Sequence, residues 1–202
     1  VVAGNFDPKK MLAKIEKTFS GIHTGKKFGK VKTIDKQSKP EILVKFKESD
    51  QTHLIIGARA FDLFDKRKYA LEILADVLGG GMSSRLFQRV REQLGAAYYV
   101  RAGVDLLTDH GYLAVSAGVD HKKLNIVITA ILDELSRLAK GELTEKELSD
   151  AKDHLTGRMM LGLETSDSLA MFYGGQEILQ KEMKTPKDVM KAIGGVKKSD
   201  VV

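Results

Sequence analysis

The stretch LGGGMSSRLFQRVREQLGAAYYV, residues 78–100, decides how the middle of the chain folds. Its three glycines, Gly79, Gly80 and Gly81, follow an apolar helical stripe, so a helix is expected to end there. Ser83 or Ser84 is suited to start a second helix, because serine is a favoured N-cap residue. The apolar and aromatic run at 97–105 then predicts a strand.

Helical patterns lie on both sides of this stretch. Apolar residues recur at helical spacing first at Tyr69, Ile73, Leu74, Val77 and Leu78, with Asp65 as the expected cap, and again at Leu124, Val127, Ile128, Ile131, Leu135 and Leu138. Thr144 and Glu147 have the spacing of a capping box. Thr185 and Pro186 predict another helix start, and Ser199-Asp200 is expected to cap a helix that the chain does not complete.

Four further segments have the apolar character of strands: residues 1–5, 42–47, 53–61 and 111–119. The segment 53–61 is almost continuously apolar, so it is expected at the centre of the sheet. Because the strands come in pairs separated by short polar turns, the sheet should be mostly antiparallel. The sequence therefore predicts an α+β fold with helices packed on one face of the sheet.

Composition excludes several classes of protein. The chain has 202 residues, 43% of them hydrophobic, and no cysteine, so neither a thiolate nucleophile nor a cysteine-bound metal is available. Its formal charge of +6 arises largely in a lysine-rich linker at 25–40, without the interleaved arginines and aromatics of a nucleic-acid surface. The sequence has no apolar run long enough to predict a membrane span. A cytoplasmic location is expected.

The sequence holds no self-contained catalytic motif. None of the five histidines stands in the H-x-x-E-H or H-E-x-x-H pattern of zinc peptidases. Glu147, Asp150 and His154 share a predicted helix face, which we interpret as a solvated face with an Asp150–His154 contact. The segment G-M-S-S-R has Arg85 where a nucleophile elbow requires glycine.

Residues 78–100 closely resemble the C-terminal, non-zinc-binding domain of the pitrilysin, insulinase and mitochondrial-processing-peptidase-like zinc metallopeptidases. The resemblance extends back to VVAGNFDP at 1–8 and forward to GELTEKELSDAKDHLTG at 141–157. It implies a processing-peptidase-like metallohydrolase fold in which residues 1–24 are a strand–helix tail of the preceding domain, 25–40 a linker, and 41–202 the substrate-binding domain.

The same resemblance implies a site. In this family an arginine and a tyrosine seven residues apart contact the substrate backbone at the scissile bond, and Arg91 and Tyr98 match them. Gly79, Gly80 and Gly81 match a glycine-rich loop implicated in handling substrate. A guanidinium and a phenol can both stabilise a carbonyl oxygen that becomes negative during attack by water.

The resemblance implies the substrate-binding half of a zinc metalloendopeptidase, inactive without its zinc-binding half. Zinc belongs to the complete enzyme, and none is expected on this chain. The expected partners are a peptide or unfolded protein and the zinc-binding half or a homologous subunit. The alternative is a non-catalytic assembly subunit. Residues 1–19 are further predicted to fold back onto their own domain, with 1–5 pairing with the sheet, or to exchange into a neighbouring copy as a homodimer, with 25–40 as the hinge.

Overall fold

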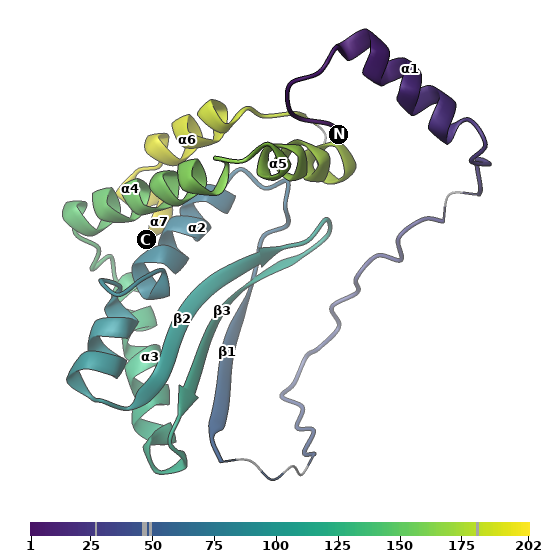
Figure 1. Ribbon diagram of the computed structural model, residues 1–202. Helices are drawn as coiled ribbons and strands as arrows, with labels where there is room; N and C mark the ends of the chain where they lie inside the picture. Colours follow the sequence, from purple (N-terminus) through teal and green to yellow (C-terminus); the bar gives the residue numbers. More distant parts are fainter. Residues whose placement is uncertain (27, 46–47, 49, 181) are drawn as a thin grey trace.

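An antiparallel sheet lies at the centre of the computed structural model, which describes residues 1–202 except 27, 46, 47, 49 and 181 (Figure 1). Within that part of the chain the sheet has three strands, β1 (Thr52–Ala60), β2 (Ala97–Leu106) and β3 (Gly111–Val119), in the order β1-β3-β2. The predicted strands 53–61, 97–105 and 111–119 are thus confirmed to within a residue.

The central strand is β3, so the expectation that 53–61 would be central is wrong. In β3 the side chains of Leu113, Val115 and Ala117 are all buried. In β1 the apolar run is divided between the two faces, and Ile55 is 70% exposed. The nearly continuous apolar run at 53–61 therefore does not mean that both faces of this strand are covered.

Helices cover one face of this sheet, as predicted, and the fold is α+β (Figure 1). Helix α2 (Lys68–Gly79) packs against β2, and α3 (Leu124–Ala139) packs against β3. The π-helix η1 (Phe87–Gln93) contacts both β2 and α3. Ile73, Leu78 and Ile131 are fully buried between these layers.

The C-terminal third is helical and covers α2. It consists of α4 (Glu145–Gly162), α5 (Ser166–Leu179), α6 (Pro186–Gly195) and α7 (Lys198–Val201), while a short 3-10 turn, η2 (His121–Lys123), precedes α3. The capping box of Thr144 with Glu147 is confirmed, and Thr185 forms a second one with Asp188. The cap assigned to Ser199-Asp200 is wrong, because Lys197 is the N-cap of α7 and Asp200 is its third residue.

The N-terminal region differs from the prediction in its strands. The helix expected within residues 1–24 is α1 (Pro8–Phe19). The Asp7 carboxylate accepts from the Lys9 amide at 2.9 Å, but none of the residues of α1 is buried. Residues 1–5 form no strand, and Val1 lies near Gly174 of α5, so the predicted fold-back onto the sheet is wrong. Exchange between two copies is not tested by a single chain and stays a prediction.

The strand expected at 42–47 is also not found in its described part. Residues 42–45 are irregular, and Phe46 and Lys47 lie outside the described residues. Ile42, Leu43 and Val44 are each more than 80% exposed. A strand needs a partner for its backbone groups, and the apolar pattern alone does not supply one.

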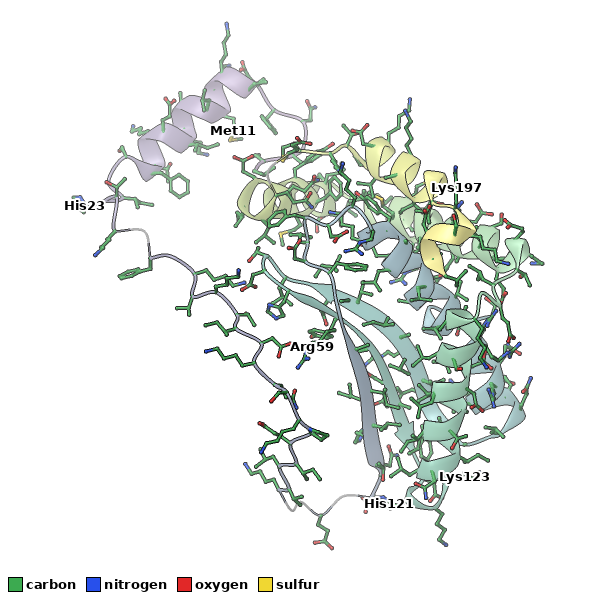
Figure 2. The ribbon with its side chains drawn as sticks, turned by 180° about the vertical axis from the view of Figure 1, so that it is seen from behind. Met11, His23, Arg59, His121, Lys123 and Lys197 are labelled. Carbon is green, nitrogen blue, oxygen red and sulfur yellow. The ribbon has the colours of Figure 1, made fainter. Side chains whose placement is uncertain are left out.

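Residues 28–40 of the linker run along the side of the sheet that faces away from α2 and α3 (Figure 1). Arg59 of β1 points toward it (Figure 2), with ion-pair and hydrogen-bond distances of 2.7 Å to Asp35 and 3.0 Å to Gln37. The Thr33 amide donates to Asp109 at 2.9 Å. Such exposed contacts are worth at most about 1 kcal/mol each, so they guide the linker without fixing it.

Candidate functional site

Arg91 lies on the π-helix η1, where the backbone departs from regular α-helix. The Leu94 amide donates to the Arg89 carbonyl at 3.1 Å, a bond across five residues. π-helical turns are rare and often occur at functional sites. The Arg91 side chain is exposed, and its guanidinium lies 5.0 Å from the centre of the Phe87 ring, which packs against the core.

A sharp turn joins η1 to β2 and fixes the path between Arg91 and Tyr98. Gly95 has a φ of +53°, a left-handed conformation that glycine adopts without a Cβ penalty. The Lys123 ammonium donates to the Gly95 carbonyl at 2.8 Å, and Ala96 is buried directly after it. The hydrogen bond from Lys123 and the burial of Ala96 therefore fix the position of this turn.

Tyr98 occupies an irregular position in β2. Ala97 is opposite Val119 of β3 and Tyr99 is opposite Gly118, so Tyr98 is the extra residue of a register shift. Bulges of this kind re-aim a side chain and are frequent next to active sites. Tyr98 is 63% exposed, and its hydroxyl has no hydrogen-bond partner among the described residues. The phenol ring is therefore largely exposed to solvent.

The adjacent tyrosine has a different role. The Tyr99 ring lies so close over Gly118 that a Cβ at that position would be 2.5 Å from the ring. Its hydroxyl is 3.1 Å from Nδ1 of His53 on β1, and the two rings stack. Tyr99 therefore joins β2 to β1 across the small central residue, which is a structural function.

The three glycines lie in three different environments. Gly79 is buried, and a Cβ there would be 2.2 Å from the Ala102 amide nitrogen of β2. A Cβ on Gly80 would be 2.1 Å from the Asp76 carboxylate. Gly81 is exposed, so its backbone is the part of the segment that a ligand can reach.

Next to Gly81, the Asp76 carboxylate pairs with His154 of α4. The Nδ1 atom of His154 is 2.8 Å from Asp76 Oδ1, which corrects the expected Asp150–His154 contact; Asp150 instead pairs with Lys146. Burial raises the pKa of Asp76, although the hydrogen bond from His154 partly opposes this. Within the described residues, no three His, Asp or Glu side chains are placed to hold a metal.

An ion cluster that we did not predict lies behind η1, around a surface cavity of about 840 Å³. The side chain of Glu134 on α3 is only 3% exposed and accepts from Arg89 at 2.9 Å and from Arg137 at 3.1 Å. Arg85 forms a two-point contact with Glu147, at 2.6 and 2.9 Å. The sequence did contain a signal, since Glu134 falls on the apolar stripe between Ile131 and Leu138.

The pairing of Glu147 predicts acid sensitivity. Burial alone would raise its pKa, but hydrogen bonds from Arg85 and Thr144 outweigh burial and lower the pKa from 4.5 to about 2. The stabilisation is thus complete above about pH 4.5 and lost as the pH falls toward 2. Because the carboxylate remains partly solvated, we expect a loss of about 1 kcal/mol, measured by urea unfolding at pH 6 and pH 2.5.

Glu147→Gln should remove this contribution to the pH dependence. Glu145→Gln, an exposed neighbour in the same helical turn, is the control and should retain the parental profile. An unchanged profile for Glu147→Gln would contradict the assignment of the acid-sensitive contact to this residue.

Comparison with known proteins places the chain in a family. A Bacillus subtilis (strain 168) protein described as the uncharacterized zinc protease YmxG is 34% identical over 96% of this chain and 47% of its own length. A Helicobacter pylori protease matches 98% of this chain and 49% of the solved structure at 20% identity and a TM-score of 0.84. A chain of complex III2 from Candida albicans matches with a TM-score of 0.76 at 17% identity, over 98% of this chain and 49% of that one.

The matched proteins are longer than this chain. The chain spans about a third to a half of the length of the curated relatives that it matches. Among its described residues, no helix is long and apolar enough to cross a membrane. The family model of the peptidase M16 inactive domain matches residues 1–155, and the chain therefore belongs to the M16 peptidase family, as a form of that inactive domain.

Proposed function

We propose that this domain is the substrate-binding half of a zinc metalloendopeptidase and is inactive without its zinc-binding half. The observation that carries the proposal is the pair of exposed donors at one junction. Arg91 lies on a π-helix and Tyr98 at a register shift, seven residues apart, and neither has a carboxylate partner among the described residues. The zinc-protease descriptions of the relatives support this class of reaction.

Both side chains can act on the carbonyl of the peptide bond that is cleaved. The Arg91 guanidinium offers several N–H donors in a planar cationic group, and the Tyr98 hydroxyl offers one O–H donor. Both would stabilise the negative charge that develops on the carbonyl oxygen as water adds. Zinc would activate that water from the other half, because the described residues of this chain offer no set suited to hold it.

The glycine segment would contact the peptide backbone through Gly81. Its amide lies at the exposed end of the segment, whereas its carbonyl already accepts hydrogen bonds from the Ser84 amide at 3.1 Å and hydroxyl at 2.6 Å. Gly79 and Gly80 lie against β2 and Asp76. We therefore propose Gly81 as the substrate contact and the other two as the residues that allow the loop to lie close to the core.

The test is complementation between separately produced halves. Neither this chain nor the zinc-binding half of the same protein should cleave a quenched-fluorescent unfolded peptide alone, and mixing them should produce cleavage. Zinc should co-purify with the other half only. Proteolysis by this chain alone, or one tightly bound zinc per chain, would show that the proposal is wrong.

An assembly subunit is the second candidate, favoured by apolar surface suited to a partner protein. Leu12 and Phe19 on α1 and Leu43, just after the linker, are all more than half exposed. The assembly role is favoured over the enzyme by two results together. The two halves would form a stable complex that cleaves no peptide, and the other half would carry no zinc.

A further inference from the structure

We propose that Glu134 is a positioning residue that holds the π-helix η1 in the orientation that presents Arg91 to substrate. This rests on the proposed role of Arg91. Glu134 is buried on the α3 side of η1, so it would act through η1 and not by touching substrate.

The burial of Glu134 needs a reason beyond stability. A buried ion pair is often no more stabilising than apolar residues of the same volume, because both charges lose their hydration. Here an apolar residue would continue the stripe of α3 between Ile131 and Leu138, both buried. The chain instead places a carboxylate with 3% exposure there and surrounds it with three arginines.

Two of those arginines connect α3 to the helical segment that carries Arg91. Arg89 lies within η1 and donates to Glu134 at 2.9 Å and to Asp133 at 2.8 Å. Arg85 lies just before η1, with its Nη1 atom 3.6 Å from Glu134; this buried atom has no hydrogen-bond partner among the described residues. The third arginine, Arg137, is on α3 itself and makes no such connection.

The geometry of η1 makes such an anchor useful. Arg89 and Arg91 are two residues apart and so point to nearly opposite sides of the helical backbone, one toward α3 and the other to solvent. A π-helical turn is rare in proteins, and we expect its position to depend strongly on tertiary contacts. Fixing Arg89 on the rigid α3 therefore limits the positions that the Arg91 guanidinium can take.

The experiment compares Glu134→Gln with the parent in the full-length protein, using a quenched-fluorescent peptide. We expect kcat to fall about tenfold with KM nearly unchanged, because a misplaced Arg91 affects the transition state more than binding. In an Arg91→Ala background the same substitution should cause no further loss of kcat. A purely structural role would lower activity by the same factor in both backgrounds.

Arg89→Gln and Arg137→Gln form a matched pair that applies even if Glu134→Gln does not fold. Each removes one arginine from Glu134, but only Arg89 belongs to η1. Arg89→Gln should lower kcat about tenfold, and Arg137→Gln should stay within about twofold of the parent.

The outcomes separate this proposal from the one on which it rests. Equal effects of Arg89→Gln and Arg137→Gln, or a loss on Glu134→Gln that persists in the Arg91→Ala background, would overturn the positioning role while leaving the role of Arg91 intact. Parental activity of Arg91→Ala would instead overturn the proposed role of Arg91, and the positioning role with it.

Discussion

Replacing Arg91 by alanine in the full-length protein should lower kcat about a hundredfold, the size of effect typical of losing one preorganised donor to a developing oxyanion. The free energy of unfolding should change by no more than about 0.5 kcal/mol, because the side chain is exposed and its main contact is with Phe87. KM should change little if the contact strengthens only in the transition state.

Steady-state cleavage of an unfolded peptide measures this effect, and Tyr98→Phe should show a similar loss, since it removes only the hydroxyl. Arg101→Ala is the matched control: it also removes an exposed arginine, one whose recorded contact is the Tyr99 ring, and it should leave kcat near the parental value. Parental turnover in both Arg91→Ala and Tyr98→Phe would contradict the proposed site.

Elements with strong local signals could be predicted from the sequence. The helical stripe that contains Leu124 and Leu138 became α3, and the Thr144–Glu147 capping box forms as expected. In both cases the information lies within a few residues of chain, in side-chain spacing or in a cap. Helix α5 was not predicted, although Thr165 caps it through Ser168.

Features that depend on distant partners could not be predicted. The order of strands, with β3 in the centre, depends on which hairpin edges meet. The His154–Asp76 pair joins residues 78 positions apart, whereas sequence spacing suggested the nearby Asp150. Family resemblance predicts a role for Arg91, but its π-helical backbone and the register shift at Tyr98 arise from packing against α3 and β3, which residue periodicity does not show.

Gly79→Ala should destabilise the domain by about 3 kcal/mol or more, because the added methyl group has no space at the α2–β2 contact. The added Cβ would be 2.2 Å from the Ala102 nitrogen and 2.8 Å from the Arg101 carbonyl carbon. Both are backbone atoms of β2, so no side-chain rotation relieves the overlap, and α2 and β2 must separate along their main contact.

The direction of this effect distinguishes packing from conformational freedom. Gly79 is the last residue of α2 and has no positive φ, so alanine is conformationally allowed there and would even favour helix by about 1 kcal/mol. Gly157→Ala in α4 is the control, because its Cβ would meet no atom within 4 Å and should leave stability unchanged or slightly raised. Urea unfolding of this chain followed by circular dichroism measures both variants. If the two variants are equally stable, close α2–β2 packing does not require glycine at position 79. A contact with substrate would then be the explanation for Gly79.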